Sequence, residues 1–393
     1  MKTGWPVKKL GDVCRTGAGG TPLKAKKEYY ENGTIPWLMS GEVSQGEVRS
    51  ATNFITQKGL ENSAAKIFPK DTVLVAMYGA TAGQVGILKF EAATNQAVCG
   101  ILPNNHFIPE FLFYLLLSRK DELVAQAAGN AQPNISQIKI RNTDIPIAPL
   151  PEQQRIVDIL DAAFDGIATA KANAEKNLQN ARALFESHLQ SVFTQRGEKW
   201  VDTKLDDVCG FQNGFAFKSS SFKENGCPIL RISNIQDGKV DTDRLVFFDP
   251  KDCRENLDRY RIVADDLLIA MSGATTGKLG FNTESTVFYL NQRVGKFEPG
   301  KKLNKRFLYH FLSTKVEENL RISAGSAQPN LSTEQIKNFA LPLPPIEEQA
   351  HIVAALESLS EETQHLTSLY QQKLAALNAL KKSLLHQAFS GAL

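Results

Sequence analysis

Long apolar runs and paired cysteines are what this 393-residue sequence most clearly lacks. No apolar run approaches the roughly 18 residues that a membrane-spanning helix needs, so we expect no part of it to cross a membrane. Residues 1–6 contain no apolar stretch, so no secretory signal is expected. The five cysteines form no Cys-x-x-Cys pair, which argues against a disulfide framework or a zinc site and favours reduced thiols in the cytoplasm.

Motifs for catalysis and cofactor binding are also missing. Residues 272–279 resemble a phosphate-binding loop, but three residues separate the glycines where that motif needs four, and Leu279 replaces the hydroxyl residue that would hold magnesium. The related loop at residues 79–84 has no lysine, and no cluster of histidines and carboxylates suggests a metal site. We expect no catalytic residue and no metal. Both loops are either tight turns between strands or loops whose glycines let the backbone approach a DNA phosphate.

The charge of the chain is small but unevenly distributed. Residues 1–150 carry 16 basic and 12 acidic side chains, and residues 196–345 carry 22 and 19. Residues 151–195 carry 4 and 6, and residues 346–393 carry 3 and 5. Two mildly basic blocks thus alternate with two mildly acidic ones. A basic block can face nucleic-acid phosphates, but excesses this small fit a solvated surface equally well.

The same motifs occur twice in the same order, which indicates an internal duplication. The second set follows the first at offsets of 194 to 196 residues. The matches are Trp5, Leu10, Asp12, Val13 and Cys14 with Trp200, Leu205, Asp207, Val208 and Cys209; Ala76-Met77-x-Gly79-Ala80-Thr81-x-Gly83 with Ala270-Met271-x-Gly273-Ala274-Thr275-x-Gly277; Asn95-Gln96 with Asn291-Gln292; Gly129-x-Ala131-Gln132-Pro133-Asn134 with Gly325-x-Ala327-Gln328-Pro329-Asn330; and Glu152-Gln153-x-x-Ile156-Val157 with Glu348-Gln349-x-x-Ile352-Val353. Five ordered matches are too many for chance.

Each half begins with a region of mixed α and β pattern. Apolar runs at residues 72–77 and 266–271 predict strands, each followed by a glycine-rich loop. One helix is predicted near residues 109–128 and its counterpart near 305–324, and the Gln-Pro-Asn turn that follows can cap a short helix through Asn or Ser. Proline-rich segments at 145–151 and 341–345 are predicted to be stiff boundaries, because proline fixes φ.

Residues 152–193 and 348–389 contain no proline, and their apolar spacing predicts two long helices. Alternating steps of four and three residues select one apolar row in each segment, which is typical of a coiled-coil seam. The seam positions are Ile156, Leu160, Ile167 and Leu184 in the first helix, and Ile352, Leu356, Leu359, Leu366, Leu377, Leu380 and Leu384 in the second. Asn177 and Lys373 interrupt these rows. Core helices of globular domains are the alternative, but they are rarely so long.

Chain connectivity then predicts the architecture. The first helix leaves the first domain and reaches the second, and the second helix runs back, so we expect an antiparallel pair, each helix about 60 Å long at 1.5 Å per residue. The predicted fold class is α+β. Two mixed α/β domains, residues 1–150 and 196–345, are joined by long helices at 151–195 and 346–393 that form a coiled coil. The duplication predicts a pseudo-two-fold repeat.

Basic side chains in predicted loops are candidates for DNA contact, because arginine is the most frequent reader of base edges and lysine usually meets phosphate. The first-domain candidates are the basic residues Arg15, Lys24, Lys26, Lys27 and Arg49, beside Tyr29 and Tyr30, together with the neutral amide Gln84. The second-domain candidates are Lys218, Arg231, Arg244, Arg254, Arg259, Arg261 and Lys278. Each one taken alone is more simply explained as a solvated surface charge.

In their order, these features resemble the specificity subunits of Type I restriction–modification systems. The resemblance rests on the repeats, the Gly-Ala-Thr-x-Gly loops, the Asn-Gln pairs, the Gln-Pro-Asn turns and the Pro-Leu-Pro-Glu-Gln and Pro-Pro-Ile-Glu-Glu-Gln segments that begin the long helices, and it covers essentially the whole chain. It implies two target-recognition domains, each reading one half of a bipartite double-stranded DNA site, with helices that set the spacer and dock two methylation subunits.

The same resemblance assigns the cofactors to partners. S-adenosylmethionine would bind the methylation subunits, and ATP and magnesium would bind restriction subunits that join some complexes, so this chain is expected to hold no cofactor. Two sets of residues are expected to order the junction between domain and helix: Glu152, Gln153, Ile156 and Val157, and Glu348, Gln349, Ile352 and Val353. Base-reading residues cannot be transferred, because recognition domains in this family vary freely.

Other functions fit parts of the pattern. A stand-alone DNA-binding scaffold, or a recognition subunit of a related methyltransferase or nuclease system, would have the same repeat. A stand-alone enzyme would need a cofactor motif, which the sequence lacks. A scaffold that joins proteins without touching DNA would differ from a DNA-binding protein in one simple property, because phosphate contact makes affinity fall steeply with salt.

Overall fold

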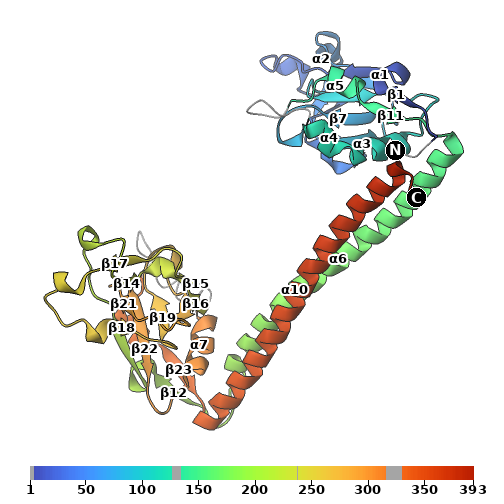
Figure 1. Ribbon diagram of the computed structural model, residues 1–393. Coiled ribbons are helices and arrows are strands. Elements are labelled where there is room, and N and C mark those ends of the chain that lie inside the picture. Colours follow the sequence, from blue (N-terminus) through green and yellow to red (C-terminus); the bar gives the residue numbers. More distant parts are fainter. Residues whose placement is uncertain (1–3, 126–133, 237, 316–329) are drawn as a thin grey trace. The chain divides into compact units, whose positions relative to one another are not determined.

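The computed structural model describes residues 4–125, 134–236, 238–315 and 330–393 (Figure 1). The chain divides into two compact units. The first comprises Met1–Glu175 with Gln371–Leu393, and the second comprises Lys176–Tyr370. Each unit therefore contains one domain and a part of both long helices. Among the described helices, none combines the length and the apolar character that crossing a membrane requires.

The first unit is built on two mixed sheets and a short strand pair. Its strands are β1 (Val7–Lys9), β2 (Thr16–Ala18), β3 (Ile35–Leu38), β4 (Glu47–Val48), β5 (Phe54–Ile55), β6 (Ile67–Phe68), β7 (Val73–Ala76), β8 (Val85–Leu88), β9 (Ala92–Thr94), β10 (Val98–Ile101) and β11 (Asp144–Pro146). One sheet has the order β2-β10-β7-β8-β4 and the other β5-β3-β9-β6, while β1 pairs with β11. Parallel pairs (β3 with β9, β4 with β8) occur beside antiparallel ones, so the sheets are mixed as predicted.

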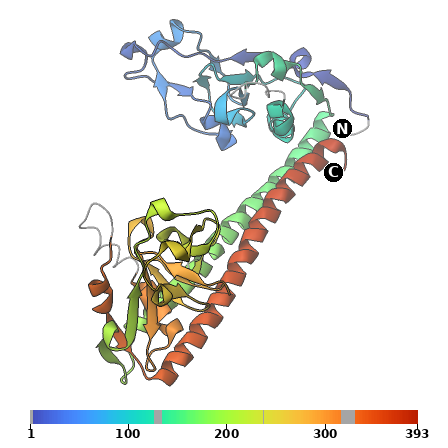
Figure 2. The ribbon, with the colours of Figure 1, turned by 60° about the vertical axis from the view of Figure 1, so that its left-hand side comes forward.

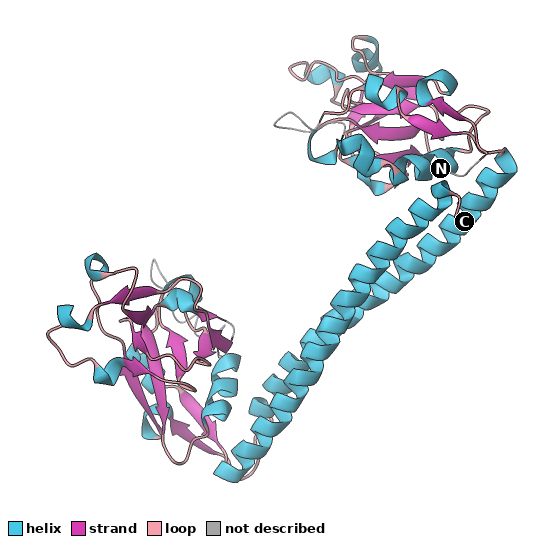
Figure 3. Cartoon of the chain, viewed as in Figure 1, coloured by secondary structure: helices cyan, strands magenta, loops and turns pink. Residues whose placement is uncertain are grey.

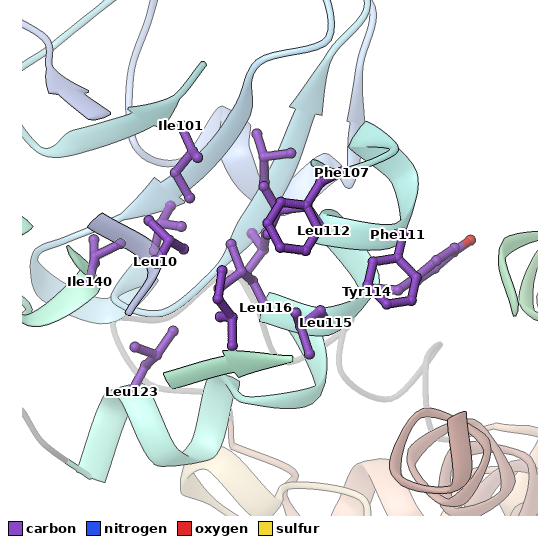
Figure 4. Close-up of a cluster of buried hydrophobic side chains, with 14 of the residues drawn as sticks. Leu10, Ile101, Phe107, Phe111, Leu112, Tyr114, Leu115, Leu116, Leu123 and Ile140 are labelled. Carbon is purple, nitrogen blue, oxygen red and sulfur yellow. The ribbon is translucent and has the colours of Figure 1, made fainter. Parts of the chain in front are cut away.

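Short helices complete this domain. They are α1 (Leu10–Val13), α2 (Gln57–Glu61), α3 (Pro109–Ser118), α4 (Lys120–Ala125) and α5 (Gln137–Arg141), with 3-10 turns η1 (Lys27–Tyr29), η2 (Glu42–Gln45) and η3 (Gly79–Thr81). Pro109 begins α3, where its missing N–H costs nothing. The apolar face of α3 packs with Leu10, Ile101 and Ile140 in one buried cluster (Figure 4).

The second unit repeats this plan. Its strands are β12 (Val201–Lys204), β13 (Cys209–Asn213), β14 (Cys227–Leu230), β15 (Ile235–Gln236), β16 (Gly238–Val240), β17 (Val246–Phe248), β18 (Arg261–Ile262), β19 (Leu267–Ala270), β20 (Leu279–Phe281), β21 (Phe288–Leu290), β22 (Val294–Pro299) and β23 (Ala340–Leu343). The sheet orders are β13-β22-β19-β20-β16-β15 and β17-β14-β21-β18, and β12 pairs with β23. The helices are α7 (Lys305–Thr314) and α9 (Thr333–Lys337), with 3-10 turns η4 (Leu205–Asp207), η5 (Ser219–Ser221), η6 (Ile232–Asn234), η7 (Pro250–Asp252), η8 (Asp258–Tyr260) and η9 (Gly273–Thr275).

The long helices are α6 (Leu150–Thr194) and α10 (Ile346–Ser390), each of 45 residues. Within each unit they lie side by side (Figures 2 and 3). In the first unit Lys171 donates to Asn378 (3.0 Å) and Arg155 donates to the Leu393 carbonyl (3.1 Å), so the helices run antiparallel there. Both helices also enter the domain cores, since Ile156 and Phe389 share one buried cluster. Phe193 and Leu356 share the corresponding cluster of the second unit.

Two predicted seam residues are wrong. Leu184 and Leu380 are 52% and 46% exposed, whereas Phe185, next to Leu184, packs against the core of the second unit. A straight helix drifts by about 20° for each heptad relative to a strict seven-residue repeat. Leu184 lies four heptads after Ile156 and Leu380 four heptads after Ile352, so each is displaced by roughly 80°, almost one residue.

The other seam residues lie on the inward side. Ile156, Leu160, Ile167 and Leu356 are buried, and Ile352, Leu359, Leu366, Leu377 and Leu384 are half-buried.

The proline-rich segments differ from their prediction as stiff boundaries. Each begins in a strand, β11 or β23, that pairs with the first strand of its own domain. Proline is tolerated because these are two-stranded sheets with a free edge, where a ladder hydrogen bond is not required of every N–H. The first and last strands of each domain therefore pair with each other, a few residues before the long helix begins.

Two other predictions are only partly covered by the described residues. The first predicted helix is two helices, α3 and α4, and its counterpart α7 is described to Thr314. Residues 129–133 and 325–329 of the Gln-Pro-Asn motifs lie outside the described residues. The short helices α5 and α9 that follow are capped by Ser136 and Ser332, whose hydroxyls accept backbone N–H bonds, in agreement with the predicted Ser or Asn cap.

Candidate nucleic-acid interface

A group of loops meets at one end of the second domain's sheets. β14, β19 and β21 end there, and β22 begins there. Asn291 N–H donates to the Leu230 carbonyl (3.1 Å), and Met271 N–H donates to the Arg293 carbonyl (2.9 Å), so the loops are joined through backbone bonds. The Thr275 hydroxyl donates to the Ile232 carbonyl (3.1 Å) and ties η9 to η6. We call this set of loops, at residues 231–236, 272–278 and 291–293, the second loop frame.

The first domain has the same frame at residues 39–44, 78–84 and 95–97. Asn95 N–H donates to the Leu38 carbonyl (2.9 Å), and Met77 N–H donates to the Ala97 carbonyl (2.8 Å). The Gln84 carbonyl accepts from Ala76 N–H, the last residue of β7, and so closes the glycine-rich turn. The Lys278 carbonyl accepts from Ala270 N–H, the last residue of β19, in the same way. The duplicated sequence motifs therefore form equivalent backbone hydrogen bonds in the two domains.

The glycine-rich loops are tight turns between antiparallel strands, as one of the two interpretations predicted. Gly79, Gly83, Gly273 and Gly277 all have φ between +71° and +84°, a conformation in which side chains are strained. Phosphate contact by these loops stays a prediction. In the second copy a side chain at Gly273 would also approach Ile232 to 3.1 Å.

The loop after the first strand of each frame is held by one buried polar side chain. Glu42 accepts from Met39 N–H (2.7 Å) and Thr52 N–H (2.9 Å). In the second domain Asn234 accepts from Arg231 N–H (3.0 Å) and donates to the Asp241 carbonyl (2.9 Å). These two side chains shape the loops and are not surface groups.

The second-domain candidates fall into two groups. Arg231 and Lys278 lie in the second loop frame, and Arg231 donates to the carbonyl of Arg244 (3.4 Å). The others lie elsewhere: Arg259 stacks on Tyr260 with 4.6 Å to the ring centre, Arg261 pairs with Asp258 (3.9 Å), and Lys218 and Arg254 are exposed. The structure thus gathers only some of the predicted residues.

The first-domain candidates are more scattered. Lys24 and Lys27 line an open pocket of about 740 Å³ together with Tyr30, Trp37 and Met39. Lys26 donates to the Tyr29 hydroxyl (3.1 Å), Arg49 pairs with Glu47, and Arg15 is exposed. Gln84 is half-buried in the first loop frame.

Arg293 is a residue that the sequence reasoning missed. It is exposed in the second loop frame and donates to Asn330 Oδ1 (3.3 Å). A signal was present, since it follows the duplicated Asn291-Gln292 pair directly.

The junction between each domain and its long helix is built around one glutamine. Gln349 is fully buried; its amide oxygen accepts from Asn304 N–H (2.7 Å), and its NH₂ donates to the carbonyls of Lys302 (2.9 Å) and Pro344 (2.8 Å). Gln153 repeats this with Ile108 N–H and the carbonyls of His106 and Ala148. Next to Gln349, the indole N–H of Trp200 donates to the Glu348 carboxylate (2.7 Å). The two glutamines therefore order the junctions.

Chemistry other than binding has little support among the described residues. They contain no group of three or more His, Cys, Asp or Glu side chains that could hold a metal. The matched cysteines Cys14 and Cys209 are buried, and burial raises the pKa of the Cys14 thiol to about 11 and that of Cys209 to about 12. Both thiols are therefore protonated and unreactive at neutral pH.

Comparison with known proteins gives the family. Residues 2–179 and 197–376 each match the family described as the Type I restriction modification DNA specificity domain. The chain belongs to this family. The sequence is 26% identical to the Type I restriction enzyme MjaVIII specificity subunit of Methanocaldococcus jannaschii, over 98% of this chain and 92% of that protein. It is also 26% identical to the EcoKI specificity subunit of Escherichia coli K12, over 100% of this chain and 90% of that one.

Solved structures show the same fold. A chain from a study of the assembly and conformational transition of a type I R-M system superimposes with a TM-score of 0.81 at 22% identity, covering 100% of this chain and 99% of that one. The HsdS subunit of Thermoanaerobacter tengcongensis gives 0.64 at 20% identity, covering 100% and 98%. The predicted family and fold class are thereby confirmed, and specificity subunits as a family are non-catalytic.

Proposed function

We propose that this specificity subunit reads a bipartite double-stranded DNA site, with each domain contacting one half through its loop frame. The observation that carries the proposal is the duplicated frame itself. Both copies have the same backbone hydrogen bonds, while the side chains on them differ, as at Gln84 and Lys278. Two copies of one scaffold with different surfaces suit two different half-sites. The DNA-contact candidates within the frames are Gln84, Arg231 and Lys278, to which we add Arg293.

The long helices would set the distance between the half-sites and bind two methylation subunits. In this arrangement the methylation subunits supply S-adenosylmethionine, restriction subunits where present supply ATP and magnesium, and the complex is an adenine methyltransferase or endonuclease. Support comes from the names of the relatives, which are subunits of Type I restriction enzymes. The sequence also lacks cofactor motifs of its own.

Methylation mapping tests the proposal. Cells that express this chain with its methylation subunits should carry methyladenine at one bipartite sequence, and cells without this chain should not. Methylation that is absent, or that does not depend on this chain, would contradict the proposal.

The purified chain alone should neither bind S-adenosylmethionine in calorimetry nor methylate DNA. Tight binding of the cofactor to the lone chain would contradict the assignment of cofactors to partners.

A further inference from the structure

The two loop frames carry side chains of different charge at equivalent backbone positions. Arg231, Lys278 and Arg293 in the second frame correspond to Met39, Gln84 and Ala97 in the first. The equivalence rests on matched backbone bonds, since Arg231 N–H and Met39 N–H both donate to the buried side chain three residues ahead. The other two pairs share the turn-closing and strand-end bonds already described. Three cationic side chains therefore stand where the first frame has none.

We infer that these three side chains make the second frame a phosphate- and base-contacting cationic patch, so that the two half-sites are bound with different dependence on salt. The inference rests on the proposed function and adds that the two frames differ in charge at equivalent positions. It also predicts that the first frame reads its half-site without a cation at these positions.

The described hydrogen bonds of Arg231 and Arg293 support a role in binding an anion. Arg231 and Arg293 donate only to neutral oxygens among the described residues, at 3.4 and 3.3 Å, which are long and weak bonds. Lys278 donates to the amide oxygen of Gln236 (2.9 Å). Elsewhere in the same unit cations face carboxylates, as Arg306 does with Asp265 (2.8 Å) and Lys337 with Asp206 (2.9 Å). Among the residues that the structure describes, no carboxylate pairs with Arg231 or Arg293, which leaves both side chains able to attract an anion.

The expected effect follows from counterion release. Each phosphate neutralised by a cation contributes about 0.9 to the slope of log affinity against log salt. Three contacts give up to about 2.7, which over a fourfold rise in salt is a difference of about 40-fold in affinity. Where an arginine or lysine reads a guanine edge instead, its replacement would remove a base preference and change the slope less.

The test replaces the three side chains by their first-domain counterparts in the full chain, as Arg231→Met, Lys278→Gln and Arg293→Ala. Because the backbone frame is the same, these side chains are already accommodated once in this fold. The control is Lys199→Gln, Lys204→Gln and Lys301→Gln, which removes the same charge from exposed positions beyond the opposite end of β22. Single Arg293→Ala, at an exposed site, serves if the triple variant does not fold.

Binding to duplexes is measured between 50 and 200 mM salt, with the chain alone and assembled with methylation subunits, and preferred sites are selected from a random duplex library. In the triple variant we expect the slope of log affinity against log salt to become shallower by about 0.9 to 2.7, or the base preference in one half-site to be lost. The control should keep both the slope and the base preference. The single Arg293→Ala variant should show a smaller change of the same kind.

A triple variant with the slope and both half-site preferences of the unmodified chain would overturn the inference. An equal loss in the control would overturn it as well, because the effect would then be one of net charge. An unmodified assembly with no base preference would refute the proposed function instead, so the two failures are distinguishable.

Discussion

Replacing Gln349 by leucine should open the junction between the second domain and α10. The side chain is fully buried, and its amide makes three bonds that connect the cap of α7, the loop after β22 and the segment before α10. Leucine has a similar size but no amide, so one backbone N–H and two carbonyls would lose their partners. Each unsatisfied buried group costs roughly 1–3 kcal/mol.

The net cost is smaller than the sum of these terms. Added burial of apolar atoms offsets about 1–2 kcal/mol, and water can reach part of the exposed Lys302 loop. We therefore expect a loss of at least about 2 kcal/mol in local stability, which corresponds to about 30-fold faster opening-dependent amide exchange. Hydrogen exchange of peptides spanning residues 300–312 and 340–353 in the full chain measures this directly.

Two variants make the measurement decisive. Gln364→Leu removes an amide from an exposed position on the same helix, where it donates to Ser360 Oγ (3.1 Å), and should change exchange little. Gln153→Leu removes the equivalent amide in the first domain and should accelerate exchange at residues 103–115 and 144–157 instead. If Gln349→Leu exchanges no faster than Gln364→Leu, the amide does not hold the junction and the reasoning fails.

Three further results are expected. A fragment of residues 1–195 should dimerise, because Leu189 and Phe193 of a second copy can occupy the places of Leu385 and Phe389 in the first core; a strictly monomeric fragment in ultracentrifugation at micromolar concentration would contradict this. Burial lowers the pKa of His310 from 6.5 to about 4, so below pH 6.5 the unfolded chain gains a proton that the folded chain does not. The free energy of unfolding should therefore fall by up to about 1.4 kcal/mol per pH unit down to about pH 4. His310→Phe should reduce this dependence on pH in thermal unfolding at pH 4–7, and an unchanged dependence would count against the role of His310. Seven residues inserted after both Ala174 and Tyr370 lengthen each helix by about 10 Å, so the methylated site should gain about three base pairs of spacer or binding should be lost; full activity at the original spacing would show that the helices are not the ruler.

Periodicity predicted the existence of the long helices better than their inward faces. The predicted segments 152–193 and 348–389 lie inside α6 and α10, which extend only a few residues further. The heptad row failed at Leu184 and Leu380. Steps of four and three residues assume 3.5 residues per turn, whereas a straight helix has 3.6, so the angular error grows along the helix. Counted from Ile156, a period of 3.6 residues would have selected Phe185 in place of Leu184.

The strands β11 and β23 show a different limit. Proline in a segment argues locally against a strand, and only the pairing partner, more than 130 residues away, makes the strand. Such a partner is not visible in a local pattern. Arg293 follows the duplicated Asn291-Gln292 pair, but only the backbone bonds placed it in the same loop frame as Arg231 and Lys278.

The hydrogen bonds of the two kinds of site explain which positions are free to vary. The loop frames are joined mainly by backbone N–H and carbonyl groups, which every residue except proline supplies, so positions 39, 84 and 97 and their counterparts 231, 278 and 293 can change side chain while the turn geometry persists. The junctions depend on the amides of Gln153 and Gln349, which few side chains could replace. A fold that fixes its recognition loops through the backbone and its domain–helix junctions through side chains can therefore acquire a new DNA sequence preference without losing the geometry that relates each domain to its helices.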